Sequence, residues 1–165
     1  MYIVGYAPRC SSLLLTMSLC IVEGTLTPEL RWQLGKRNGI TPRSERLKKN
    51  FKSLEELKSM YNLLQPRSIK GENQVSAFFD AYYGGMEVLR LEEDFYDLAM
   101  AYFVRAAGMN VRYCEVFFDP QAHIRRGVEM RVVMNGLKRA QIEAAERLNV
   151  GGKRLARSLA LTELG

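Results

Sequence analysis

The hydrophobic positions of this chain follow two different periods. Residues 11–22 form an almost continuous apolar run that stops abruptly at Glu23, and residues 111–118 are rich in β-branched and aromatic side chains and stop at Asp119. Short apolar runs that end at acidic, glycine or proline turn residues are typical of buried strands. We therefore predict one strand in each of these two stretches.

Helical periodicity accounts for most of the remaining chain. Residues 27–29 (TPE) have the order of an N-cap, a proline at the first helical position and a first-turn acid, and residues 38–39 (NG) supply a stop. Ser53 and Glu56 have the spacing of a capping box. Apolar residues three or four apart then predict further helices near residues 75–89, 92–108 and 129–148.

Two glycines, Gly84 and Gly85, fall inside the helical pattern of residues 75–89. Each costs about 1 kcal/mol relative to alanine in a helix interior, so we expect close packing or a kink there. The order of strand, several helices, strand and helix predicts an α/β fold with parallel βα units. About two such units are present, which is too few to close a sheet.

The charge of the chain permits contacts with nucleic acid or anionic surfaces without requiring them. The formal net charge is +6. The basic residues are accompanied neither by aromatic side chains on which bases could stack nor by a helix suited to contact bases in a groove. We therefore expect them to lie in solvated loops and helix ends, and we expect no nucleic-acid partner. The basic residues gather in three places: Arg43, Arg46, Lys48, Lys49 and Lys52; Arg125 and Arg126; and Lys153, Arg154 and Arg157.

Cysteine usage points to a reducing compartment. The 3 cysteines, Cys10, Cys20 and Cys114, show no CxxC spacing, which argues against a disulfide framework and against a zinc ribbon. A site of these cysteines with His123 is disfavoured because no two of them share a chelating loop. We expect a cytoplasmic protein, with the nucleus as an additional location. The apolar run at residues 11–22 is too short to span a bilayer, and a targeting peptide stays a minor alternative.

Three stretches of the sequence carry a resemblance to a known family. They are EGTLTPELRWQLGKRNGI (residues 23–40), FFDAYYGGMEVLRLEEDFYDLAMAYFVRAAGMNVRYCEVFFDPQAHIRRGV (residues 78–128) and MNGLKRAQIEAAERL (residues 134–148). Together they resemble the N-terminal third to half of the adenosine/adenine deaminases. EGTL and EVFFDPQAH resemble the adenine deaminase branch more than the nucleoside branch, and matches of this length are far more specific than a short motif.

The resemblance implies an N-terminal fragment of a zinc-dependent (β/α)8 TIM-type barrel. Water would replace the exocyclic amino group of adenine, giving hypoxanthine and ammonia in purine salvage. In such a site the metal lowers the pKa of a bound water and a carboxylic acid protonates the ring nitrogen, at the C-terminal ends of the strands. Residues 1–165 would be a single partial deaminase domain, in which residues 23–148 follow the family and residues 1–22 and 149–165 are atypical ends.

The metal ligands that the resemblance implies are missing from the first predicted strand. The family has a His-x-His pair one residue before its Glu-Gly-Thr-Leu stretch, and the matching positions here are Leu19 and Ile21, whose side chains offer no lone pair. The other family ligands, a third histidine and an aspartate, and the catalytic glutamate would follow the end of this chain. His123 matches a family histidine that is not a ligand. We therefore expect no catalytic residue, no metal ligand and no zinc bound by this chain, although zinc serves the family.

Glu23 is the one candidate substrate-binding residue. By position it resembles the acid that faces the substrate, and a glutamate there would favour the free base adenine over its nucleoside. The alternative is a carboxylate that stabilises the following helical turn. Asp119 ends the second strand, where Asp-Pro is also a common turn. His123 is expected to form loop hydrogen bonds, since no nucleophile stands near it in the sequence.

Two hypotheses of different classes follow. In the first, the chain is a truncated adenine deaminase-like protein that is catalytically incompetent by itself, so whether it is an enzyme stays open. In the second, it is a non-catalytic interaction module that docks on a deaminase subunit or another partner through an exposed barrel edge. A third hypothesis, nucleic-acid binding through the basic loops, is weaker, and none of the three involves a membrane.

Overall fold

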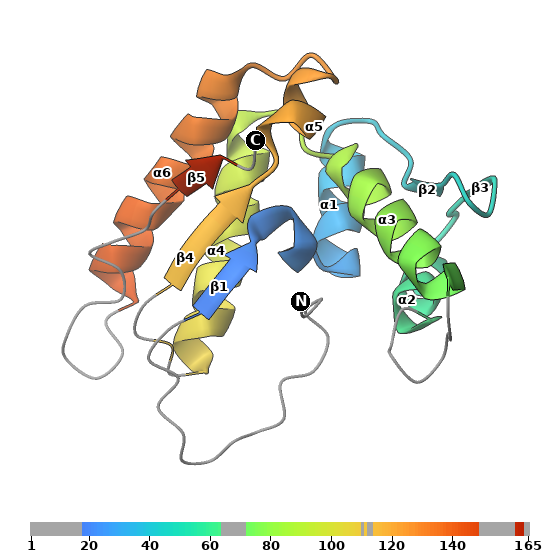
Figure 1. The fold of residues 1–165 in the computed structure, drawn as a ribbon, viewed down its shortest axis with the longest axis horizontal. Helices are drawn as coiled ribbons and strands as arrows, with labels where there is room; N and C mark the ends of the chain where they lie inside the picture. The colour runs from blue at the N-terminus through green and yellow to red at the C-terminus, as the bar shows by residue number, and fades with distance from the viewer. Residues whose placement is uncertain (1–17, 64–71, 110, 112–113, 149–160, 164–165) are drawn as a thin grey trace. The chain divides into compact units, whose positions relative to one another are not determined.

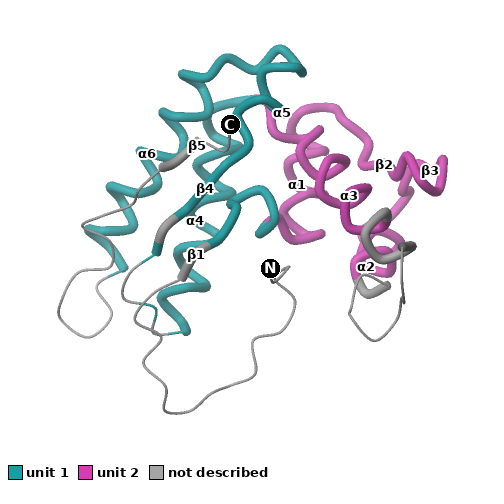
Figure 2. The backbone as a smooth tube through the Cα atoms, viewed as in Figure 1, with its two compact units in different colours: residues 1–25, 91–165 teal, residues 26–90 magenta. Residues whose placement is uncertain are grey.

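The computed structural model describes residues 18–63, 72–109, 111, 114–148 and 161–163. These residues form two compact units (Figure 2): the described parts of residues 1–25 and 91–165 form unit 1, and the described parts of residues 26–90 form unit 2. The predicted strand at residues 11–22 is therefore described only in part, and most of the tail at residues 149–165 lies outside the described residues.

Unit 1 is built on a parallel three-stranded sheet in the order β1-β4-β5 (Figure 1). The central strand is β4 (Cys114–Phe118), and Cys20 of β1 (Ser18–Ile21) is in register with Val116. The third strand, β5 (Leu161–Glu163), pairs with the other edge of β4. The sequence predicted the first two strands but not β5, since the preceding residues are glycine-rich and basic.

Two long helices, α4 (Glu92–Gly108) and α6 (Met130–Arg147), pack against each other in unit 1. At the first turn of α4 the Asp94 carboxylate accepts a hydrogen bond of 2.8 Å from the backbone N–H of Leu91, and the helix ends at Gly108 as predicted. Gly136 allows the close approach of α6, because a Cβ there would lie 2.4 Å from the backbone oxygen of Glu92.

Unit 2 contains three helices and a short antiparallel hairpin. The helices are α1 (Pro28–Arg37), α2 (Leu54–Leu63) and α3 (Glu72–Met86), and the hairpin joins β2 (Arg43–Ser44) to β3 (Lys49–Asn50). The predicted caps are present: the backbone N–H of Leu30 donates to Oγ1 of Thr27 at 3.2 Å, and that of Glu56 donates to Oγ of Ser53 at 3.2 Å. The hairpin was not predicted, because its residues are polar and show no alternation.

A buried arginine explains the glycine pair in α3. Arg31 is fully buried, and its Nη2 donates to the backbone oxygen of Arg43 at 2.8 Å. A Cβ on Gly84 would lie 2.9 Å from that Nη2 and 3.2 Å from the Arg43 oxygen, so glycine leaves the space that the guanidinium fills. Close packing at this pair was predicted, but its partner was not, because arginine is rarely fully buried.

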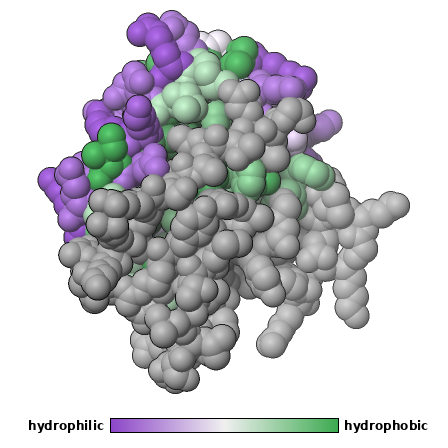
Figure 3. Space-filling view, turned by 60° about the vertical axis from the view of Figure 1, so that its left-hand side comes forward, coloured by the Kyte–Doolittle hydropathy of each residue, from purple (hydrophilic) through white to green (hydrophobic). Residues whose placement is uncertain are grey.

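None of the described helices is long and apolar enough to cross a bilayer. In the view of Figure 3 hydrophilic residues predominate along the upper and left-hand margins, with hydrophobic residues in small areas between them. Exposed side chains such as Val104 and Ile142, each 52% exposed, lie on different helices, which is ordinary for a folded surface.

Candidate functional site

Glu23 lies immediately after the C-terminal end of β1, in the short helical turn η1 (Val22–Thr25). Two hydrogen bonds hold this turn: Oγ1 of Thr25 donates to the backbone oxygen of Val22 at 2.7 Å, and Nη2 of Arg105 donates to that of Thr25 at 2.8 Å. The Glu23 carboxylate therefore lies at the C-terminal end of a parallel strand, and Glu23 is only 4% exposed.

The groups that contact Glu23 follow the end of β4. Oε1 of Glu23 accepts a hydrogen bond of 2.9 Å from the backbone N–H of Asp119, and it lies 2.8 Å from Nε2 of His123. The Asp119 carboxylate caps the helix α5 (Pro120–Ile124) by accepting from the backbone N–H of Ala122 at 3.1 Å. The structure thus brings the three residues singled out by the sequence together, with Asp119 as a helix cap.

The tautomer of His123 follows from its second neighbour. Nη2 of Arg126 lies 2.8 Å from Nδ1 of His123, and a guanidinium can only donate. Nδ1 must therefore accept, so the proton of the neutral ring is on Nε2 and is donated to Glu23. The imidazole is fully buried, and the Phe95 ring meets it edge to face with 4.9 Å between centroids.

One oxygen of Glu23 remains available. Oε2 is buried and has no hydrogen-bond partner among the residues that the structure describes. Buried carboxylate oxygens are almost always satisfied in folded proteins, so this one needs a donor from elsewhere. The arrangement can accept a hydrogen bond from an N–H or O–H group of a small ligand.

The residues at the end of β1 do not suit a zinc ion. Leu19 and Ile21 have no donor atom, and the intervening Cys20 is the one side chain among these three that has one. Burial raises the pKa of the Cys20 thiol to about 11, against a smaller lowering by its hydrogen bond with Tyr102, so it stays protonated at neutral pH. Metal binding needs the thiolate. In the described part of the chain no three His, Cys, Asp or Glu side chains are grouped as metal ligands.

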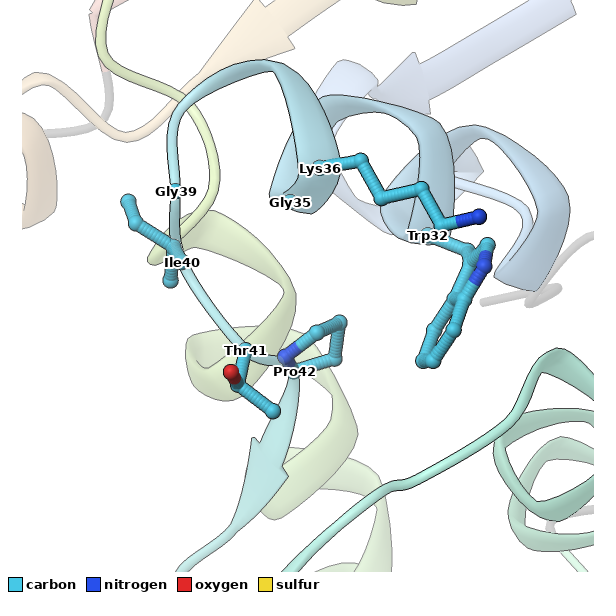
Figure 4. Close-up of a pocket in the computed structure, with 7 residues that line it drawn as sticks. All are labelled: Trp32, Gly35, Lys36, Gly39, Ile40, Thr41 and Pro42. Atoms are coloured by element: carbon cyan, nitrogen blue, oxygen red, sulfur yellow. The ribbon is translucent and has the colours of Figure 1, made fainter.

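A shallow cavity of about 250 Å³ lies in unit 2, apart from the residues predicted by sequence. It is lined by Trp32, Gly35, Lys36, Gly39, Ile40, Thr41 and Pro42 (Figure 4). Nζ of Lys36 lies 5.5 Å from the centroid of the Trp32 ring, a cation–π contact. No buried polar group lines this cavity, so its chemistry indicates no ligand.

Some of the basic residues of the described chain take part in local ion pairs and hydrogen bonds. Nη2 of Arg43 pairs with Glu87 at 2.9 Å and with Glu45 at 2.8 Å. Arg126 contacts His123, as described above. The third basic group, Lys153, Arg154 and Arg157, lies outside the described residues.

Comparison with known proteins agrees with the resemblance seen in the sequence. A family model described as adenosine deaminase matches residues 20–162, which extends beyond residues 23–148 at both ends and reaches into β5. The adenine deaminase of Zymomonas mobilis is 44% identical over 129 residues, which cover 78% of this chain and 34% of that protein. That of Acinetobacter baylyi is 43% identical over the same length and coverage. The chain thus spans about a third of the length of these curated relatives.

Solved structures confirm the fold. The crystal structure of an adenine deaminase from Arthrobacter aurescens superposes with a TM-score of 0.70 at 34% identity, over 92% of this chain and 39% of that one. An amidohydrolase from Burkholderia ambifaria with bound zinc gives a TM-score of 0.58 at 21% identity, over 85% of this chain and 34% of that one, a likeness of fold alone. The predicted fold class, an N-terminal part of a (β/α)8 barrel with about two βα units, is confirmed.

Sequence reasoning missed two residues of the site. Arg126 was counted only as part of a basic pair, and Phe95 only as one position of an apolar helix face. The spacing of His123 and Arg126, three residues apart after a helix cap, is a local signal that could have indicated their contact. The packing of Phe95 on His123 has no such signal, because α4 and α5 belong to different βα units.

Proposed function

Because this chain belongs to the adenosine deaminase family, we propose that it forms the adenine-facing N-terminal part of an adenine deaminase-type barrel but cannot hydrolyse adenine by the family's zinc chemistry. The observation that carries this proposal is the juxtaposition at the end of β1. A buried glutamate, whose Oε2 has no hydrogen-bond partner among the described residues, follows a strand in which Leu19 and Ile21 replace the expected imidazoles.

The Glu23 carboxylate supports adenine as the ligand. The heterocycle and its exocyclic amino group present N–H donors, and Oε2 is an acceptor without a partner among the described residues. The relatives described above, which are bacterial adenine deaminases, agree with this choice. Binding of a neutral purine through such an acceptor requires no metal. A chain that has lost its zinc ligands can therefore still bind adenine without hydrolysing it.

The proposed function excludes zinc-dependent activation of water, because the chain lacks the ligands for the metal. A zinc site needs several N, S or O ligands, and aliphatic side chains at two adjacent ligand positions remove half of a four-ligand set. Without the metal no bound water reaches a pKa near neutrality, so no hydroxide is generated for attack on adenine. We place the protein in the cytosol, where the two described cysteines, Cys20 and Cys114, would stay free thiols.

A chimera tests this proposal. In the chimera, this chain replaces the matching third of the Zymomonas mobilis adenine deaminase. One version carries the unsubstituted chain, and the other carries Leu19→His and Ile21→His together. Hypoxanthine formation and zinc content are then measured. We expect turnover and stoichiometric zinc only in the chimera with both histidines. Deamination by the unsubstituted chimera would refute the proposed incompetence, and a doubly substituted chimera that folds and binds zinc but ignores adenine would refute the proposed substrate.

A second function is favoured by the sheet itself. Among the described strands β1 pairs only with β4, so its other edge presents backbone hydrogen-bonding groups. We propose as the alternative that this edge docks on strands of a full-length deaminase subunit. Co-expression with such a subunit and size-exclusion chromatography check this. A fixed stoichiometric complex supports docking, and separate elution of the two chains rejects it.

A further inference from the structure

We propose that Arg126 is a positioning residue that acts through His123 to keep Oε2 of Glu23 as a hydrogen-bond acceptor for an N–H group of the purine. This inference rests on the proposed function, in which Glu23 faces adenine. It adds a chain of three side chains, Arg126, His123 and Glu23, whose order and proton placement follow from two hydrogen bonds of 2.8 Å each.

The first step of the argument concerns the lone pair of Nδ1. The Arg126 guanidinium donates to it, so this nitrogen cannot carry a proton at the same time. The imidazole is held neutral with its single proton on Nε2, and that proton points to Oε1 of Glu23. The edge of the Phe95 ring fixes the plane of the imidazole, with 83° between the two rings.

The second step concerns the two oxygens of Glu23. Oε1 receives both local donors, the backbone N–H of Asp119 and Nε2–H of His123. Oε2 receives none among the described residues. Because both donors sit on one oxygen, the carboxylate cannot rotate without losing them, and the other oxygen keeps a fixed direction for a ligand donor.

The third step concerns the tautomer. Without the Arg126 donor, the neutral ring can carry its proton on Nδ1 instead of Nε2. Nε2 would then face Oε1 of Glu23 as a second acceptor, and the carboxylate would lose one of the two donors that fix its orientation.

The sole histidine of the chain makes this proposal directly measurable. In the full-length ¹⁵N-labelled chain at pH 7.5, long-range ¹H–¹⁵N correlation spectra of the imidazole report which nitrogen carries the proton. We expect a single neutral species with Nε2 protonated and Nδ1 bare. An imidazolium or an Nδ1-protonated ring in the unsubstituted protein would overturn the inference without any variant being needed.

Matched variants test the role of Arg126. Arg126→Leu should give a signal with Nδ1 protonated, while Arg126→Lys, which keeps a donor, should retain most of the original spectrum. Arg125→Leu is the control, because this neighbouring arginine is exposed and its Nη2 lies 3.5 Å from Oε1 of Gln121. An unchanged imidazole spectrum in Arg126→Leu would refute the role of Arg126.

Adenine binding to the same proteins separates this inference from the proposed function. Calorimetric titration with adenine should show about 10-fold weaker binding for Arg126→Leu and loss of binding for Glu23→Gln, with no change for Arg125→Leu. If the expected tautomer is observed and adenine does not bind, the proposed substrate fails and the side-chain arrangement stands. If adenine binds equally to Arg126→Leu and the unsubstituted chain, the positioning role fails and the proposed substrate stands.

Discussion

At the scale of single residues, the local environment decides what each polar group can do. Glu23 and His123 are both almost completely buried, yet each has partners that suit a charged carboxylate and a neutral ring. Cys20, which lies shortly before Glu23 in the sequence, has the opposite environment. Burial dominates there, and the nearby Arg105, itself with a pKa lowered by desolvation, does not offset it.

The thiol of Cys20 should therefore react slowly in the folded protein. Its pKa of about 11, raised from 9.0, leaves about 100-fold less thiolate at pH 8 than in the unfolded chain. We expect alkylation of Cys20 by iodoacetamide to be slower by at least that factor in buffer than in 8 M urea, as measured by mass spectrometry of its peptide. Equal rates in both conditions would show that burial does not protect this thiol.

The same raised pKa has a consequence for stability. The folded state holds the Cys20 proton more tightly than the unfolded state, so this group contributes its full stabilisation below about pH 9 and loses it as pH rises through about 11. We expect Cys20→Ala to be less sensitive to pH than the unsubstituted chain in urea titrations across this window. Parallel pH curves for the two proteins would contradict the expectation.

At the scale of elements, the features that could be predicted from sequence are the local ones. The caps at Thr27 and Ser53 and the stop at Gly108 depend on neighbouring residues, and the structure contains all three. The contact between Glu23 and His123 spans 100 residues, and nothing local indicates it. The burial of Arg31 was missed for the same reason, because its hydrogen-bond partner is the backbone oxygen of Arg43, 12 residues further along the chain.

Gly136 determines how closely α6 approaches α4. An added Cβ would lie 2.4 Å from the Glu92 backbone oxygen and 2.8 Å from Cβ of Phe95, so the helices would have to separate. We expect Gly136→Ala to lower the free energy of unfolding by about 1–3 kcal/mol, even though alanine favours the helix by about 1 kcal/mol. Urea unfolding followed by circular dichroism measures this change.

Gly108→Ala is the matched control for this substitution. Gly108 also belongs to a helix, but a Cβ there would meet no atom within 4 Å. We expect this variant to be as stable as the unsubstituted chain or more stable by a few tenths of a kcal/mol, in line with the usual effect of Gly→Ala at an unstrained position. A destabilisation equal to that of Gly136→Ala would show that helix approach is not the cause.

At the scale of the whole molecule, every described contact of the candidate site lies in unit 1. Glu23, Phe95, His123 and Arg126 all belong to residues 1–25 or 91–165. Unit 2 has a separate hydrophobic cluster around Leu57, with Phe51, Met60 and Ala81. Chains built of several compact units frequently unfold in more than one step, so damage to one core need not reach the other.

Leu57→Ala should therefore destabilise unit 2 and leave the site intact. Leu57 is fully buried, and its truncation costs about 2–5 kcal/mol in a well-packed core. Leu98→Ala is the matched substitution in unit 1, on α4 and equally buried. With the His123 signals as the probe, urea titration should give an unchanged midpoint for Leu57→Ala and a clearly lower one for Leu98→Ala, while circular dichroism reports helix loss in both. A His123 midpoint lowered as much by Leu57→Ala as by Leu98→Ala would mean that the two cores unfold as one cooperative system, and the site would then depend on residues far outside its own unit.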